Sequence, residues 1–354
     1  MRHWFGPRPP PLSLALQGGG AHGAFTWGVL DALLERGVQI AALSGASAGA
    51  MNAVACAHGL AVNGHDGARE ALRAFWRAVA DHMPPLWHLP GDPPSLAPAG
   101  RALLAWSRWL APAQLNPLDV NPLRSVLAAQ IDFERLRTTA GPALFIATTE
   151  AESARLRLFR RDVLTLDALL ASACLPALAR PVVIDGHALW DGAFSANPAL
   201  WPLVREVAAD DLMLVTLAPL TPVALPADAA GITARTLDVA FLAPFMREAR
   251  WLAEAQADTQ RGSWTRLRTG LDRRLARLRW HLLDADDTLA HLPGQTRLMP
   301  EWEFLQRLRD RGRERVDRWW HEHHDRLGRG SSLDALACFG GDAPGSVLRN
   351  RRAD

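Results

Sequence analysis

Short apolar runs, separated by glycine loops and amphipathic stretches, recur along the first part of the chain. Residues 12–16 form a continuous apolar run that predicts a buried strand, and residues 25–36 have the periodicity of an amphipathic helix that ends at Gly37. Residues 38–43 predict a second strand, and residues 50–58 predict a second helix. The repeated order of strand, loop and helix predicts a parallel sheet with helices packed against it.

The pattern continues with further strands and then changes character. Residues 144–148 and 212–217 predict strands, residues 166–172 a helix, and residues 181–190 a hairpin that turns at Asp185-Gly186. After the proline-rich stretch 219–226 the chain is mainly helical and rich in Arg. We therefore predict two parts, an α/β domain at residues 1–225 and a helical extension at residues 226–354.

The composition fits a folded globular protein and argues against nucleic acid as its main partner. Apolar residues make up 49% and charged residues 21%, close to ordinary globular usage. The formal net charge of +2 argues against a chain built to neutralise nucleic-acid phosphates. The chain has 14 Trp, no Tyr and no Lys, so Arg supplies all 39 basic side chains. This bias has two interpretations, genomic base composition or an adaptation to lipid interfaces, where Trp and Arg are suited.

The cysteines and the apolar stretches give no sign of secretion or of a membrane span. Cys56, Cys174 and Cys338 are odd in number and widely spaced, which favours a reducing compartment over a disulfide framework. The opening MRHWFGPRPPP carries prolines where a secretory signal needs an apolar core. Residues 41–62 are uncharged and long enough to span a bilayer, but Gly, Ala, Ser, Asn and His dominate them. We expect a cytoplasmic protein in which this run is a packed interior turn and helix.

A serine lies in a glycine-bounded pentapeptide directly after the second predicted strand. The segment GASAG at residues 45–49 has the form GxSxG around Ser47. Small neighbours permit the strained strand-to-helix turn that presents a hydroxyl to a substrate. The same letters occur by chance in the packing turns of Gly- and Ala-rich chains. Its position between a strand and a helix is what favours a nucleophile.

The loop after the first predicted strand, GGGAHG at residues 18–23, has two interpretations. Its glycines let backbone N–H groups approach a reacting centre and donate to a developing oxyanion. The letters also fit the GxGxxG of dinucleotide-binding folds, but residues 40–44, where such a fold places an acidic ribose ligand, contain no acid. A Walker P-loop is excluded because the chain has no Lys.

A third segment, Asp191-Gly192-Ala193, places a carboxylate at the end of the second hairpin strand. Alone it is a common turn, and Asp185-Gly186 is expected to be one. The small residues after Asp191 permit another loop to approach it. In an apolar pocket, desolvation would raise the proton affinity of this carboxylate and make it a better base at neutral pH.

The three segments GGGAHG, GASAG and DGA, in this order, make the chain resemble the patatin-like phospholipase family. The resemblance extends through ALQGGGAHGAFTWGVLDALLERG, ASACLPALARPV and DGAFSANPALWPL, and covers approximately residues 12–203. The stretch EWEFLQRLRDRGRERVDRWW is similar to the tail of some bacterial members. The family implies a three-layer α/β/α fold with a mostly parallel central sheet, here followed by the helical extension.

The resemblance also implies a Ser–Asp dyad that works without histidine. Ser47 would be the nucleophile and Asp191 the general base, with the backbone of Gly18, Gly19 and Gly20 as the oxyanion hole. It implies no metal and no organic cofactor. Two positions depart from the usual pattern, because His22 stands where many relatives have Arg or Lys and Ala193 where many have Gly. The first departure bears on headgroup or oxyanion electrostatics, and the second is a tolerated variant.

The implied function is that of a lipid acyl hydrolase that cleaves ester bonds of phospholipids or other lipids at a membrane or lipid-body surface. A peripheral, cytoplasmic enzyme is expected, and the sequence leaves its oligomeric state open. Two alternatives stay open: a general carboxylesterase or acyltransferase on the same dyad, and a lipid-binding protein without catalysis. Residues 83–121, rich in Pro and Trp, are expected to be either a surface connection or a lid at the mouth of a lipid site.

Histidines provide an alternative mechanism, a Ser-His-Asp triad. The chain has 12 of them, with His187 close to the acid and His321, His323 and His324 near the end. This last cluster misses the zinc motif HExxH because position 325 is Asp, which favours a solvated helix face. Residues 266–280 predict a basic amphipathic helix, suited either to anionic lipid headgroups or to packing on the core.

Overall fold

The computed structural model describes residues 10–82, 87–107, 109–261 and 269–340. Residues 1–9, on which the prediction of no secretory signal mainly rests, lie outside the described residues. Residues 83–86 of the predicted insertion and residues 266–268 of the predicted basic helix do so too.

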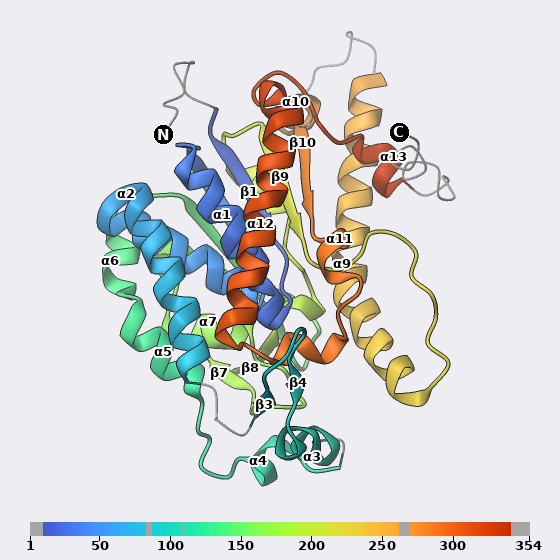
Figure 1. Ribbon diagram of the computed structural model, residues 1–354. Helices are drawn as coiled ribbons and strands as arrows, with labels where there is room; N and C mark the ends of the chain where they lie inside the picture. The colour runs from blue at the N-terminus through green and yellow to red at the C-terminus, as the bar shows by residue number, and fades with distance from the viewer. Residues whose placement is uncertain (1–9, 83–86, 108, 262–268, 341–354) are drawn as a thin grey trace.

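A central sheet runs through the molecule (Figure 1). Its strands are β1 (Leu12–Leu16), β2 (Ile40–Gly45), β5 (Ala143–Glu150), β6 (Leu156–Arg160), β7 (Val182–Ile184), β8 (His187–Asp191), β9 (Asp211–Thr216) and β10 (Arg279–Asp284). The order is β10-β9-β1-β2-β5-β8-β7, and β6 pairs with β5 beside this path. Strands β10, β9, β1, β2 and β5 are parallel, whereas β6 and β8 run antiparallel to β5, and β7 runs antiparallel to β8. Two short strands, β3 (His88–Leu89) and β4 (Ser95–Leu96), form a separate hairpin.

Helices connect the strands. The α-helices are α1 (Gly23–Glu35), α2 (Ala48–Asp81), α3 (Pro98–Trp106), α4 (Pro112–Leu115), α5 (Pro122–Gln130), α6 (Phe133–Thr138), α7 (Leu166–Ser172), α8 (Trp201–Glu206), α9 (Ala229–Arg261), α10 (Gly270–Arg277), α11 (Asp286–Leu289), α12 (Trp302–His323) and α13 (Ala335–Phe339). Short 3-10 turns are η1 (Gly20–His22), η2 (Arg161–Val163), η3 (Gly192–Phe194), η4 (Gly294–Leu298) and η5 (His324–Arg326).

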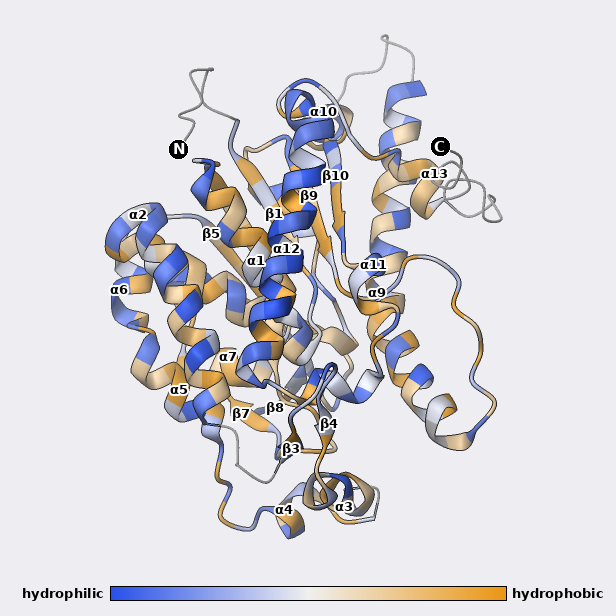
Figure 2. Cartoon of the chain, in the orientation of Figure 1, coloured by the Kyte–Doolittle hydropathy of each residue, from blue (hydrophilic) through white to orange (hydrophobic). Residues whose placement is uncertain are grey.

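Both faces of the sheet are covered, as the alternation of side chains along β1 makes plain. Leu12, Leu14 and Leu16 pack into the core formed with α1, α2 and α12, whereas Ala15 packs into a second core formed with α8, α9, α10 and α13. The sheet strands are correspondingly apolar in Figure 2. A parallel sheet buried on both faces gives near-continuous apolar runs, which is why the sequence marked these strands clearly. The predicted three-layer α/β/α fold is confirmed.

The predicted elements agree with the structure most closely where the apolar signal is continuous. The strand at residues 12–16 and the helix at residues 166–172 have the bounds that the sequence predicts. The second helix is much longer than expected, because it continues to Asp81 after a break at Asn63 and Gly64. Gly64 has φ +57, a left-handed conformation that glycine adopts at low cost. The second half of the helix was not predicted because the polar and glycine residues around this break interrupt the helical pattern.

The region after residue 226 is not purely helical. Strand β10 pairs in parallel with β9 at the edge of the central sheet. The predicted helix at residues 266–280 was wrong at its carboxyl end, because α10 ends at Arg277 and Trp280 lies in β10. Leu275 and Leu278 are buried in the second core, so the apolar side of α10 faces the protein. The boundary at residue 225 stays a prediction, since the sheet itself extends beyond it.

Helix α12 packs tightly along α1 in the first layer (Figure 1). Glycines make the approach possible: a Cβ at Gly28 would lie 1.9 Å from the carbonyl oxygen of Arg309, and one at Gly312 would lie 2.1 Å from that of Phe25. Any larger residue at these two positions would force the helices apart. The carboxy-terminal helix therefore helps to hold α1, which begins at the glycine loop.

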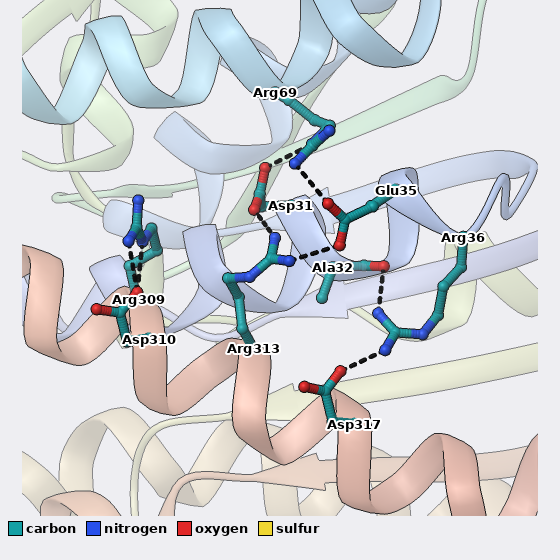
Figure 3. Close-up of polar contacts among 9 residues, drawn as sticks. All are labelled: Asp31, Ala32, Glu35, Arg36, Arg69, Arg309, Asp310, Arg313 and Asp317. Carbon is teal, nitrogen blue, oxygen red and sulfur yellow. Dashed lines mark hydrogen bonds and ion pairs between the residues drawn. The ribbon is translucent and has the colours of Figure 1, made fainter. Parts of the chain in front are cut away.

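Ion pairs also hold α1 against α2 and α12 (Figure 3). Asp31 of α1 accepts hydrogen bonds from Arg69 of α2, at 2.8 Å, and from Arg313 of α12. Glu35, one turn further along α1, pairs with the same two arginines. Single exposed ion pairs contribute little, but Asp31 is mostly buried and the four charges form one network across three helices. The network fixes α1 against both neighbours.

Among the described residues, no helix combines the length and the apolar character needed to cross a bilayer. The uncharged run at residues 41–62 forms most of β2, the turn around Ser47 and the first part of α2. Most of it is buried, as predicted for a packed interior segment.

Candidate functional site

Ser47 lies on a strained turn between β2 and α2. Its backbone has φ 53 and ψ −126, in a region that non-glycine residues rarely adopt, and α2 begins at the next residue. Such strain costs on the order of 1–3 kcal/mol and persists only where the surroundings enforce it. The Ser47 N–H donates to the carbonyl oxygen of Ser172 at 3.0 Å and to its hydroxyl at 3.1 Å. This tie to α7 helps to hold the turn.

The glycines on either side of Ser47 are required by close backbone contacts. A Cβ at Gly49 would lie 2.1 Å from the carbonyl oxygen of Leu16, and one at Gly45 would lie 2.5 Å from the backbone of Gly49. Close packing at the carboxyl end of β2 therefore requires the two glycines of the GxSxG motif. It leaves the serine at the carboxyl end of β2 and at the amino terminus of a long helix, where developing negative charge is favoured.

Asp191 is the last residue of β8 and is fully buried. Its N–H donates to the carbonyl oxygen of Cys174 at 2.8 Å, and its Oδ1 accepts the N–H of Ala193, also at 2.8 Å. Oδ2 has no hydrogen-bond partner of ordinary geometry. Burial raises the pKa of Asp191 to about 7, opposed by the Ala193 N–H and by the Ser47 hydroxyl, which faces the carboxyl. The structure thus brings Ser47 and Asp191 together, and the predicted desolvation of the carboxylate is present.

The glycine loop lies directly against the serine turn. The N–H of Gly18 donates to Oδ1 of Asn197 at 2.7 Å, so this amide is already engaged. Among the described residues, no acceptor pairs with the N–H groups of Gly19, Gly20 or Ala48. Gly20 and Ala48 both line the pocket that contains Ser47. Of the three unpaired amides, those of Gly20 and Ala48 belong to residues that line the pocket with Ser47, whereas the amide of Gly18 anchors the loop.

Two buried asparagines, which the sequence analysis did not single out, tie the pieces of the site together. Asn197 holds Gly18, as described above. Asn52, on α2, donates to the carbonyl oxygens of Gly23 at 2.9 Å and Ala48 at 3.1 Å, and so joins the starts of α1 and α2. Its side-chain oxygen accepts the indole N–H of Trp76 at 3.0 Å.

A largely apolar pocket of about 460 Å³ opens at Ser47. Its walls come from α2, the start of the predicted insertion, α5 and η4, and include Met51, Phe75, Trp76, Trp87, Leu123 and Leu298. Few polar groups interrupt this lining, which suits a hydrocarbon chain beside a reactive carbonyl. A larger, charged hollow between α11 and α12 does not include Ser47.

No histidine completes a triad among the residues that the structure describes. Neither Ser47 nor Asp191 forms a hydrogen bond with an imidazole nitrogen there, and His187 is exposed. His22 is buried, bonded to the hydroxyl of Thr296 at 2.7 Å, and its pKa is lowered to about 3 by burial and by the charge of Arg297. It is neutral at physiological pH, so it carries no charge toward the oxyanion site. Within the same described ranges, no three His, Cys, Asp or Glu side chains gather as they would at a metal site, the 321–324 cluster included.

Comparisons with known proteins identify the family of the chain. The family model for patatin-like phospholipase matches residues 14–204, more than half of the chain. A search of the curated proteins found no match. Among solved structures, VipD from Legionella pneumophila is similar at 16% sequence identity and a TM-score of 0.42, over 90% of this chain and 67% of that one. The family match covers the glycine loop, Ser47 and Asp191, and it shows that the chain belongs to the patatin-like phospholipase family, a family of lipid acyl hydrolases.

Proposed function

We propose that this chain hydrolyses carboxylic ester bonds of phospholipids or related lipids, with Ser47 as nucleophile and Asp191 as general base. The observation that carries the proposal is the unpaired Oδ2 of Asp191, buried beside the hydroxyl of the strained Ser47. A buried acceptor without a partner is costly in a structural role, but it is what a proton-accepting group requires. Its pKa of about 7 matches a base that works near neutral pH.

The first half of the reaction forms an acyl-enzyme. Oδ2 of Asp191 takes the proton of the Ser47 hydroxyl while Oγ forms a bond to the ester carbonyl carbon. The carbonyl oxygen becomes an oxyanion, which the free N–H groups of Gly19 and Gly20 stabilise, with Ala48 as a third donor. The place of Gly18 in this hole stays a prediction; its N–H donates to Oδ1 of Asn197 and so helps to position the loop. Collapse of the intermediate expels the alcohol, which leaves with the proton from Asp191.

The second half releases the fatty acid. A water molecule attacks the acyl carbonyl, Asp191 takes one of its protons, and the same amides stabilise the second oxyanion. Collapse returns the proton to Oγ of Ser47 and frees the acid. The apolar pocket holds the acyl chain throughout, so that the remote hydrocarbon orients the reacting carbonyl.

We propose further that the enzyme acts peripherally, from the cytoplasm, on lipid in a membrane or a lipid body. Long-chain lipid esters are held in such surfaces, so an enzyme with this pocket must reach them there. Cys56, Cys174 and Cys338 are all free thiols, which supports a reducing compartment.

Fatty-acid release from phospholipid vesicles and turnover of a soluble p-nitrophenyl ester test the proposal. Ser47→Ala and Asp191→Asn should each abolish or nearly abolish both activities, while His187→Ala, at an exposed histidine on the same strand as the acid, should match wild type. Activity on the soluble ester alone would favour a general carboxylesterase, and transfer to an added alcohol would favour an acyltransferase. Hydrolysis that persists in Ser47→Ala would overturn the mechanism and favour a lipid-binding role.

A further inference from the structure

The segment that leaves the pocket wall at Trp87 and rejoins it at Pro122 exposes a dense set of apolar side chains. They are Trp106 (61% exposed), Trp109 (86%), Leu110 (37%), Leu118 (84%) and Val120 (63%). Single exposed apolar residues are ordinary, but a cluster within so short a stretch marks a surface that contacts something else. We call these five residues the rim surface.

Hydrogen bonds anchor both ends of the segment that carries the rim surface. At its start, the indole N–H of Trp87 donates to the carbonyl oxygen of Leu298 at 2.9 Å. At its end, the guanidinium of Arg180 donates to the carbonyl oxygen of Pro117 at 2.9 Å. Helices α3 and α4 project from the lower end of the molecule in Figure 1. Trp106, Trp109 and Leu118 do not line the pocket, so in this structure these side chains do not cover Ser47.

The charges of the segment and its position beside the pocket indicate which kind of partner the rim surface contacts. The segment between Trp87 and Asn121 carries four charged residues in its sequence, Asp92, Arg101, Arg108 and Asp119, whose formal charges cancel; Arg108 lies outside the described residues. A protein partner or an anionic headgroup bound mainly by charge would find little to pair with. The segment that carries the rim surface joins the pocket wall at both of its ends, where Trp87 and Pro122 line the apolar pocket at Ser47. Tryptophan partitions well into the boundary between headgroups and hydrocarbon.

From this placement, and resting on the proposed function, we infer that the rim surface docks on a lipid bilayer by inserting its apolar side chains into the interfacial layer. Docking there brings the mouth of the Ser47 pocket to the lipid, so that an acyl chain passes from bilayer to pocket across an apolar path. Attraction to anionic headgroups is secondary. The basic helix α10 takes no part, since its apolar side is buried in the second core and it lies at the opposite end of the molecule in Figure 1.

The start of α9 exposes further apolar side chains. Leu225 lies in the loop before α9, and Ile232 and Val239 lie in its first three turns; all three are exposed. Asp238, next to Val239, pairs with Arg297, a residue of the pocket wall. This ion pair ties the start of α9 to the pocket wall.

Partition of the full chain onto vesicles of dialkyl phosphatidylcholine tests the inference, because these ether lipids cannot be hydrolysed. We expect wild type to co-sediment with pure phosphatidylcholine vesicles. The double variant Trp106→Ser/Trp109→Ser should bind at least about tenfold more weakly, since two large side chains no longer leave water. Hydrolysis of vesicle phospholipid should fall in parallel, while turnover of a soluble short-chain ester stays at the wild-type rate.

Trp251→Ser provides the matched control, because Trp251 is half exposed but lies in the second half of α9, away from the rim surface. It should bind vesicles as wild type does. Leu118→Asp, a change at the other exposed tip of the segment, should weaken binding without altering soluble-ester turnover and so guards against a folding defect in the double variant.

Three results would overturn the inference. The double variant could bind vesicles as tightly as wild type. Binding could require phosphatidylserine and disappear at high salt, which would make docking electrostatic. The wild type could form a dimer that the double variant disperses, without binding vesicles, which would make a second copy the partner. The partition measurement needs no catalysis, so it is read independently of whether Ser47→Ala abolishes hydrolysis.

Discussion

Around Ser47, glycines touch neighbouring backbone and buried side chains hold the loops, whereas Trp106, Trp109 and Leu118 at the rim of the same pocket are largely exposed to solvent. In the interior region, a Cβ at Gly49 has no room and Asn197 engages the amide of Gly18. In the rim region, Trp109 and Leu118 have almost no protein contact to lose. The two regions border one pocket and are built for different tasks.

The difference follows from what each task tolerates. A nucleophile, a base and an oxyanion site must keep their relative positions to within a fraction of an ångström, which only dense packing and satisfied hydrogen bonds ensure. Contact with a fluid bilayer needs apolar area and no fixed geometry. Substitutions should therefore affect stability and kcat in the interior region, and affect only delivery to lipid surfaces at the rim.

The largest contrast is expected from one added methyl group. Gly49→Ala places a Cβ 2.1 Å from the Leu16 carbonyl oxygen, so strand and helix must separate. We expect the free energy of unfolding to fall by about 3 kcal/mol, as for other overpacked sites. Gly91→Ala in the rim region, whose Cβ meets its nearest atom at 3.0 Å in an exposed loop, should change it by less than about 0.5 kcal/mol. Denaturant titration of both variants decides, and equal losses would refute the distinction.

A smaller effect is expected from removing one side-chain acceptor. Asn197→Ala frees the Gly18 N–H and loosens the glycine loop beside Ser47, so kcat for a soluble ester should fall by about 10- to 100-fold with KM nearly unchanged. Asn116→Ala removes a similar acceptor at the rim, where Oδ1 takes the Val120 N–H at 3.0 Å. Its kcat should match wild type. A rise in KM alone for Asn197→Ala would assign this residue to substrate binding instead.

A further effect, which needs no substitution, is expected from pH. Below about 7 the Asp191 carboxyl is protonated and cannot accept the Ser47 proton, so activity should rise about tenfold per pH unit and level off above 7. The same raised pKa means that the folded state holds a proton that the unfolded state has lost between about pH 4 and 7, so this group's contribution to stability declines as the pH rises through that window.

His187→Ala, as the control for the pH profile, should keep the same limb near pH 7, and Asp191→Asn should remove the contribution of Asp191 to the pH dependence of stability in this range. If the rise in activity toward pH 7 were lost in His187→Ala, the result would favour a Ser-His-Asp triad.

Much of the fold was predictable from the sequence because its signals are local. Strand β1, helix α7 and the hairpin turn at Asp185-Gly186, where both residues have positive φ, follow from apolar runs and turn chemistry. The second half of α2 was missed because Asn63 and Gly64 interrupt the helical pattern. Strand β10 was missed because its Arg-rich flank resembles a helix, while its place in the sheet depends on pairing with β9, far away in the sequence.

The site divides in the same way. Ser47, Asp191 and the glycine loop stand in short motifs whose spacing carries their chemistry, so the sequence could nominate them. The engagement of Gly18 could not be foreseen, since its partner Asn197 lies 179 residues away. The segment DGAFSANPALWPL contains that asparagine, but nothing local identifies the amide that it accepts. Exposure of the rim tryptophans likewise depends on how the segment is anchored by Leu298 and Arg180.

Covalent capture of the nucleophile tests the central claim most directly. A fluorophosphonate forms a stable phosphonyl ester with an activated serine, and intact-mass and peptide analysis then locate it. We predict one adduct, on the peptide that contains Ser47, formed at the wild-type rate in His187→Ala, much more slowly in Asp191→Asn and not at all in Ser47→Ala. An adduct on another residue, or labelling that survives Ser47→Ala, would contradict the account.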